Sequence, residues 1–143
     1  MYQFWLEDVS KVFVQDLIAV NRINLQIKTG ERVAFIGPSG AGKTTLFRML
    51  NCTIRPTSGR LWINGDEAGR LYSRRLRGVR RKIGTIYQQH NLVPRLKVVH
   101  NVLSGKLGRW SLLSSLLSLI RPAELELAFD SLKKVGIEEK IFT

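Results

Sequence analysis

A short glycine-rich segment constrains this chain more than any other feature. Residues 37–44 read Gly-Pro-Ser-Gly-Ala-Gly-Lys-Thr and fit the pattern G-x-x-x-x-G-K-[S/T]. The segment follows a continuous apolar run at 33–36, which is typical of a strand covered on both faces. It precedes residues 46–50, whose spacing suits a helix. Because the pattern needs this strand and helix context, we interpret it as a phosphate-binding loop and not as a glycine-rich turn with a solvated lysine.

The residue types in the loop suit a magnesium nucleoside triphosphate. Glycines let the backbone curl so that successive N–H groups converge on phosphates, and the following helix adds its positive N-terminal dipole. Lys43 supplies a point charge to the terminal phosphates, and the hydroxyl of Thr44 suits Mg²⁺. The candidate phosphate-binding residues are Gly37, Pro38, Ser39, Gly40, Ala41, Gly42, Lys43, Thr44 and Thr45. Since kinases, GTPases and transport ATPases all use such a loop, the flanking sequence has to identify the protein.

Apolar spacing predicts the elements around the loop. Strands are expected at 4–9, 23–27 and 83–87, and at 61–63 before a tight turn at Asn64 and Gly65. A basic helix is expected over 70–83. Its apolar face holds Tyr72, Leu76, Val79 and Ile83, and its cationic face holds Arg70, Arg74, Arg77 and Arg81.

The remainder of the chain, from Val98 onward, has helical character. Two apolar stripes are expected, one of Leu113, Leu116, Leu117 and Ile120 and the other of Leu125, Phe129 and Leu132. Pro122 is expected to begin the last helix, because proline is favoured in the first turn. The apolar stretch 110–120 could pack in a core or form a surface that contacts a membrane protein, and the sequence leaves both interpretations open. It is too short and too rich in serine to span a bilayer.

The large excess of positive charge is the most unusual feature of the composition. The 143 residues include 23 Lys and Arg against 11 Asp and Glu, a formal net charge of +12. All 11 acids lie outside 68–123, so the whole excess lies in that segment. Nucleic acid, an anionic membrane surface and phosphate-bearing ligands all suit such a balance. The single Cys52 and the absence of a leader pattern predict a cytosolic protein without disulfides.

Three segments in order make the chain resemble the ATP-binding subunit of an ABC transporter. Residues 6–13 resemble the family's opening strand and aromatic A-loop, and Phe13 matches the position whose ring stacks on adenine. The phosphate loop is followed by Pro-Thr-Ser-Gly at 56–59 and Ile-Asn-Gly at 63–65, as in the family. Ile-Tyr-Gln at 86–88 resembles the Q-loop, so the resemblance implies that Gln88 helps to position Mg²⁺ and water.

A finer resemblance is to the phosphonate-import branch of that family. It rests on residues 76–84, on Asn-Leu-Val at 91–93 and on 101–109. Three positions depart from the branch, because Cys52 replaces a usual glycine, His90 a usual aromatic residue and His100 a usual acid. An importer of another anion or of an amino acid is the alternative within the family.

The resemblance ends before the family's signature motif, Walker B acids and switch histidine. Leu-Ala-Phe-Asp at 127–130 imitates a Walker B strand, but its spacing is helical and Ser131 follows where an acid is needed. We therefore expect a truncated ATP-binding subunit whose isolated ATPase activity is negligible, because phosphoryl transfer needs a positioned nucleophile as well as a cradle for the phosphates.

The resemblance implies an α/β fold, a P-loop NTPase of ABC type that is incomplete. Residues 1–97 would form the N-terminal part of the ATP-binding core and 98–143 the beginning of a helical subdomain. The implied cofactors are ATP and Mg²⁺. The implied partners are a second ATP-binding subunit, a transmembrane permease and an extracytoplasmic substrate-binding protein, at the cytoplasmic face of the inner membrane. A basic nucleic-acid-binding P-loop module is the rival from another class, and an inert product is a third possibility. Nucleic acid is the less expected partner, because no recognised binding motif is present.

Overall fold

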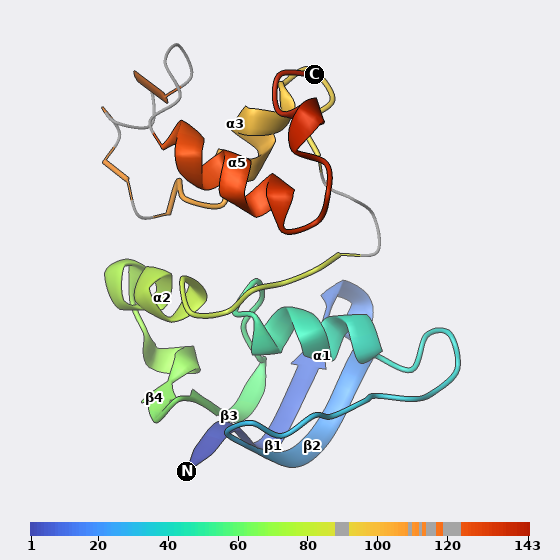
Figure 1. The fold of residues 1–143 in the computed structure, drawn as a ribbon. Helices are drawn as coiled ribbons and strands as arrows, with labels where there is room; N and C mark the ends of the chain where they lie inside the picture. Colours follow the sequence, from blue (N-terminus) through green and yellow to red (C-terminus); the bar gives the residue numbers. More distant parts are fainter. Residues whose placement is uncertain (88–91, 109, 112, 114–116, 119–123) are drawn as a thin grey trace. The chain divides into compact units, whose positions relative to one another are not determined.

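The computed structural model divides the chain into two compact units, Met1–Thr85 and Ile86–Thr143. It describes residues 1–87, 92–108, 110–111, 113, 117–118 and 124–143. Figure 1 shows the first unit as a small sheet covered by one helix, and the second as a group of short helices.

The sheet of the first unit has four antiparallel strands in the order β2-β1-β3-β4. They are β1 (Tyr2–Val12), β2 (Ile18–Lys28), β3 (Ser58–Ile63) and β4 (Asp66–Glu67), and a 3-10 turn, η1 (Val14–Asp16), joins the first two. Leu6 lies opposite Leu25 on one side and Leu61 on the other, so one sheet face is apolar. The alternation expected at 23–27 and 61–63 is confirmed, because side chains two apart on a strand share a face. The strand expected at 4–9 forms, but an irregularity between Leu6 and Val9, with Asp8 at φ 45°, interrupts its alternation, so both Leu6 and Val9 are buried.

Helix α1 (Lys43–Leu50) covers the apolar sheet face, as Figure 1 shows. Leu46, Met49 and Leu50 are buried and lie on the stripe that a helical period of 3.6 brings together. Each such side chain contributes about 1.5–3 kcal/mol when it leaves water. The core of the unit consists of Leu6, Val9, Val20, Leu46, Met49, Leu50, Cys52, Leu61, Ile63, Ala68, Leu71 and Val79. Packing of β1–β3 under α1 therefore fixes the position of the helix, at whose start the glycine-rich segment ends.

Two of the expected strands do not form. Residues 33–36 and 83–87 have no regular secondary structure, and Ile36 and Ile86 are almost wholly exposed. The prediction relied on their apolar character, but a strand also needs a hydrogen-bonded neighbour. The described part of the chain pairs all its strands within the β2-β1-β3-β4 sheet and offers neither segment a partner.

The basic helix is shorter than expected. A 3-10 turn, η2 (Ala68–Arg70), precedes α2 (Ser73–Arg80), and Val79 is the helix residue that is buried. Leu76 and Ile83 pack partly against the core, as their spacing predicts. Tyr72, expected on the same face, is 85% exposed, because it lies in extended backbone before the helix starts.

The second unit contains α3 (Val98–Ser104), α5 (Leu125–Lys133) and a 3-10 turn, η3 (Glu138–Lys140). Its core consists of Val99, Leu103, Ala128, Leu132 and Ile141. The helical interpretation of 127–130 is confirmed, since these residues lie inside α5. None of the helices in the described part of the chain is long and apolar enough to cross a membrane.

The apolar stripes expected in this unit are only partly correct. Leu132 is buried, but Ala128 packs beside it while Leu125 and Phe129 stay about 40% exposed. In the other stripe Leu113 and Leu117 are exposed. Leu116, Ile120 and Pro122 lie outside the described residues, and α5 begins at Leu125. The spacing locates the helix, but the elements packed against it decide which part of its surface is buried.

Glu124 links the start of α5 to the segment after α3. Its carboxylate pairs with the ammonium of Lys106 at 3.0 Å and accepts a hydrogen bond from the indole of Trp110 at 3.3 Å. The hydrogen bond from Lys106, then that from Trp110, lowers the pKa of Glu124 below its usual value.

Candidate functional site

The phosphate-binding loop leads directly into α1, through two glycines in the left-handed region, but the strand expected before it at 33–36 does not form. Residues between the end of β2 at Lys28 and the start of α1 at Lys43 have no regular structure. Within that stretch Gly40 has φ 81° and Gly42, the residue that caps α1, has φ 80°. Other residues adopt this conformation at a cost, so the glycines let the chain turn back before the helix begins.

Gly42 also permits a close approach between the loop and the sheet. A Cβ atom on Gly42 would lie 2.1 Å from the carbonyl oxygen of Ala19 in β2, whereas one on Gly40 would meet nothing within 4 Å. The N-terminus of α1 therefore lies directly against the backbone of β2, and only glycine fits there.

Lys43 folds back over the loop. Its ammonium donates hydrogen bonds to the carbonyl oxygens of Gly37 at 2.6 Å and Pro38 at 2.7 Å. Within the loop, the N–H of Ala41 donates a hydrogen bond to the carbonyl oxygen of Pro38 at 3.3 Å and so closes a turn. An ammonium has three donors, so this arrangement holds the positive charge over the loop and leaves one donor for a phosphate oxygen.

Backbone N–H groups at the start of α1 supply further donors. The first helical hydrogen bond runs from the N–H of Leu46 to the carbonyl of Gly42 at 2.9 Å. The N–H groups of Lys43, Thr44 and Thr45 therefore have no partner within the helix, and no side chain caps it. The positive end of the helix dipole lies at these groups, so this end of α1 favours an anion. The hydroxyl of Thr44 is exposed in the same turn, where it can bind a hard cation.

A cavity of about 540 Å³ adjoins the loop. Its walls come from the loop and start of α1, from β2 and from the irregular segment 34–36. The lining residues are Ala19, Val20, Asn21, Ile23, Ala34, Phe35, Ile36, Ala41, Gly42, Lys43 and Leu46. Sequence reasoning missed the four from β2, because no local pattern reveals which strand will lie beside the loop. The mixed lining suits a ligand with a charged end and an apolar body.

The structure places the predicted residues of the loop close to one another, but it does not bring the other predicted site residues to them. Ala41, Gly42 and Lys43 line the cavity, and Gly37 and Pro38 bind the ammonium of Lys43. Phe13 is not among the lining residues; its ring is 38% exposed and lies 5.4 Å from the ammonium of Lys11. Gln88 and His90 lie outside the described residues. The described part of the chain holds no cluster of metal-ligating side chains.

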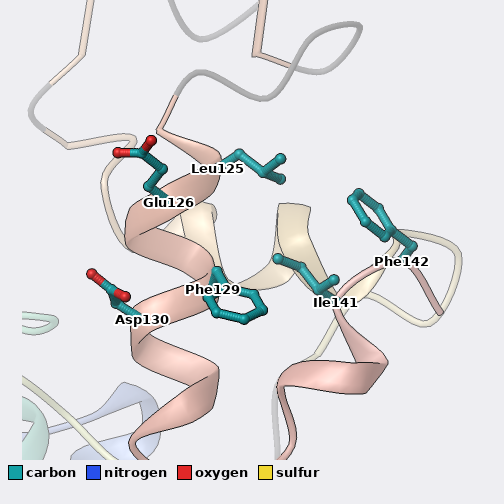
Figure 2. Close-up of a pocket in the computed structure, with 6 residues that line it drawn as sticks. All are labelled: Leu125, Glu126, Phe129, Asp130, Ile141 and Phe142. Carbon is teal, nitrogen blue, oxygen red and sulfur yellow. The ribbon is translucent and has the colours of Figure 1, made fainter.

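A second cavity, of about 410 Å³, lies within the second unit and has a different character. Figure 2 shows Phe129, Ile141 and Phe142 around it, while the carboxylates of Glu126 and Asp130 point to the other side of α5. The other residues that line it are Leu125, Glu126 and Asp130, so its lining combines apolar side chains with two carboxyl groups and holds no cation. Such a lining does not suit an anionic ligand.

Cys52 is a packed core side chain. It is 5% exposed, and burial raises the pKa of its thiol, an effect that the nearby guanidinium of Arg80 partly offsets. A thiol held in its neutral form reacts slowly, so Cys52 acts as a small packed side chain and not as a reactive thiol.

The chain matches known proteins over most of its length. The family model described as "ABC transporter" matches residues 20–142. The phosphonates import ATP-binding protein PhnC of Bacillus thuringiensis subsp. konkukian is 45% identical over 94% of this chain and 52% of its own length. PhnC 2 of Halalkalibacterium halodurans is 38% identical over 94% of this chain and 55% of its own length. The chain thus spans about half the length of the curated relatives it matches.

Solved structures agree with the family match. The dimeric structure of MJ0796, a bacterial ABC transporter cassette, has a TM-score of 0.69 and 34% identity over 76% of this chain and 48% of that one. A post-hydrolysis state of the same cassette, bound to ADP and Pi, has a TM-score of 0.66 and 30% identity over 96% of this chain and 61% of that one. The phosphate-binding loop, the family model and the relatives and solved structures all agree, so the chain belongs to the ABC transporter family.

Proposed function

We propose that this chain binds MgATP at the loop 37–45 and belongs to the ATP-binding subunit of an importer for phosphonates. The observation that carries the proposal is the arrangement of donors at the loop. The ammonium of Lys43 is held over the loop by two carbonyl oxygens, beside the unpaired N–H groups of the first turn of α1. The substrate class rests on the relatives whose names state phosphonate import.

Different groups of the loop would bind different parts of a triphosphate. Backbone N–H groups of Lys43, Thr44 and Thr45 would donate to phosphate oxygens, and the ammonium of Lys43 would neutralise the terminal charge. The hydroxyl of Thr44 would bind Mg²⁺, which supplies charge neutralisation between the phosphates. The apolar part of the cavity, with Val20 and Phe35, would accept the nucleoside. Phe13 and Gln88 keep their proposed roles as the adenine-stacking ring and the Mg²⁺- and water-positioning amide.

We expect this chain to bind nucleotide without measurable turnover by itself. Hydrolysis needs a group that orients the attacking water as well as a charged cradle. Among the described residues that line the cavity there is no carboxylate and no histidine. The proposed partners are a second ATP-binding subunit, a permease and an extracytoplasmic substrate-binding protein, and the proposed location is peripheral, on the cytoplasmic face of the inner membrane.

Fluorescent ATP titration of the purified chain tests the binding proposal. Lys43→Ala is expected to weaken nucleotide affinity roughly tenfold or more, because a charge-assisted contact to phosphate is worth about 1.5–3 kcal/mol. Arg48→Ala is the matched control, since it removes one positive charge from an exposed position of the same helix. Equal affinity of the two variants would contradict the proposed role of the loop.

Growth of the source cells tests the substrate class. Lys43→Ala in a complete version of the subunit is expected to abolish growth on a phosphonate as sole phosphorus source and to leave growth on inorganic phosphate unchanged. If growth on phosphonate is normal but uptake of another anion or of an amino acid is lost, the alternative importer is correct.

A further inference from the structure

Helix α2 and the residues just before and after it carry a dense group of exposed cations that the nucleotide site does not use. This arginine face consists of Arg70, Arg74, Arg75, Arg77, Arg81 and Lys82, all exposed. The inner side of the helix is held by buried Val79 and half-buried Leu76. Arg80 belongs to that inner side, because its guanidinium donates to the carbonyl oxygen of Cys52. The other cations therefore project from a helix whose orientation within the first unit is set by packing.

The charges of the arginine face are largely uncompensated. Arg70 pairs with Glu67 at 3.2 Å, and Arg77 donates to the carbonyl of Ser73 at 3.4 Å. Within the described part of the chain, the side chains of Arg74, Arg75 and Arg81 make neither a hydrogen bond nor an ion pair. The acids nearest in sequence are Asp66 and Glu67, and the next 56 residues contain none.

The spacing of these cations weakens the helix instead of stabilising it. Like charges at i, i+4, such as Arg77 and Arg81, cost a few tenths of a kcal/mol per pair. Gly78, between them, lowers helix propensity further. Folding of the first unit does not account for the cluster, so its chemistry points to an anionic partner.

We propose that the arginine face docks on an anionic lipid surface. The inference rests on the proposed function in that it assumes a subunit working at a membrane. Guanidinium groups match lipid phosphates in a bidentate way, and each cation near an anionic bilayer adds about 1 kcal/mol of attraction. Tyr72, which is 85% exposed beside these cations, is the kind of amphipathic ring that lies well at the level of headgroups.

A nucleic acid is the less suitable partner for this surface. Recognition of bases uses amides, hydroxyls or stacked aromatic rings between the phosphate contacts. Across 70–82 the arginine face offers one aromatic ring, Tyr72, and one hydroxyl on Ser73, with no Asn or Gln. A planar array of headgroups requires only a broad cationic face, which this helix provides.

Sedimentation of the full chain with vesicles tests the proposal. We expect binding to phosphatidylcholine vesicles that contain phosphatidylglycerol, no binding to phosphatidylcholine alone, and release as salt rises from about 0.1 M to about 1 M. Arg74→Gln with Arg75→Gln and Arg81→Gln removes three charges whose side chains make no hydrogen bond or ion pair to the described residues. This variant should lose roughly a hundredfold in vesicle affinity, about fivefold per charge.

The matched control replaces Lys133, Lys134 and Lys140 by Gln, three exposed cations of the second unit near Glu138 and Glu139. Its vesicle affinity should change no more than about twofold per charge, because Asp130, Glu138 and Glu139 lie within a few residues of these lysines and lower the local net charge. An equal loss in both triple variants, or unchanged binding by the arginine variant, would overturn the proposal.

Two further measurements separate this inference from its rival and from the proposed function. A short DNA duplex is titrated at the same salt, and tighter binding to duplex than to anionic vesicles would overturn the lipid assignment in favour of nucleic acid. Fluorescent ATP is titrated with both triple variants, which should bind it as the unchanged chain does. A chain that binds nucleotide but not anionic vesicles refutes the docking surface alone, and one that binds vesicles but not nucleotide refutes the proposed function alone.

Discussion

Gly40 and Gly42 have nearly the same backbone conformation but different surroundings. Both lie near φ 80° in the phosphate-binding loop. A Cβ atom would have free space at Gly40, whereas at Gly42 it would collide with the carbonyl oxygen of Ala19. The left-handed conformation can therefore be separated experimentally from the close approach of loop and strand.

Gly40→Ala is expected to lower the free energy of unfolding by about 1–2 kcal/mol, the cost of a left-handed conformation for alanine. Gly42→Ala should cost clearly more, because β2 or the start of α1 must shift to remove the collision, and it should also weaken ATP binding. Urea denaturation and fluorescent ATP titration measure the two effects. Equal losses of stability in both variants would show that β2 does not lie against Gly42.

Sequence spacing located helix α2, and a hydrogen-bonded arginine adds to the packing of Val79 and Leu76 in holding it. The guanidinium of Arg80 donates to the carbonyl oxygen of Cys52 through Nε at 3.1 Å and Nη2 at 2.5 Å. Cys52 follows directly on the end of α1, so this contact ties the last turn of α2 to the C-terminal end of α1, where a cation is favourable. Spacing placed Arg80 in the basic helix, but the bond depends on a contact 28 residues away.

Arg80→Leu is expected to lower the free energy of unfolding of the first unit by about 1–3 kcal/mol, because the carbonyl of Cys52 loses a charged donor. Arg81→Leu is the matched control, since the exposed side chain of Arg81 bonds to none of the described residues. It should change stability by no more than about 0.5 kcal/mol. Urea denaturation followed by circular dichroism gives both values, and an equal loss in the two variants would mean that the bond to Cys52 contributes nothing.

At the scale of the molecule, the described residues form two hydrophobic cores, one in each compact unit. The first core joins the β2-β1-β3-β4 sheet to α1 and includes Leu61. The second joins α3 to α5 and includes Leu132. Both side chains are nearly fully buried, at 1% and 4% exposed. Units with separate cores can open independently, so we expect a poorly cooperative thermal transition.

Leu61→Ala is expected to reduce hydrogen-exchange protection in Met1–Thr85 only, and Leu132→Ala in Ile86–Thr143 only. Each substitution should cost about 2–5 kcal/mol within its own unit, because it leaves a cavity in a packed core. Peptide-level hydrogen exchange measured by mass spectrometry follows both units in one experiment. If either substitution lowered protection throughout the chain, or if the thermal transition were sharp, the two units would form one cooperative structure.

The chain's local patterns predicted much of this fold. The strand at 4–9, the alternation in β2, the Asn64-Gly65 turn and the helix after the loop are all present, because the periods of strand and helix are properties of neighbouring residues. The segment 33–36 shows where this reasoning fails. Its apolar run is compatible with a strand, but pairing depends on a second segment that local sequence does not identify.

By itself the sequence determined the phosphate-binding loop, the family resemblance and the concentration of positive charge in 68–123. These depend on residue identity and short spacing, so no tertiary contact is needed to recognise them. Only the tertiary structure decided that β2 forms one wall of the cavity, that Gly42 lies against Ala19, and that Arg80 turns inward while Arg74, Arg75 and Arg81 stay exposed. Those features arise from contacts between segments far apart in the chain, and their geometry follows from packing and hydrogen bonding across the fold.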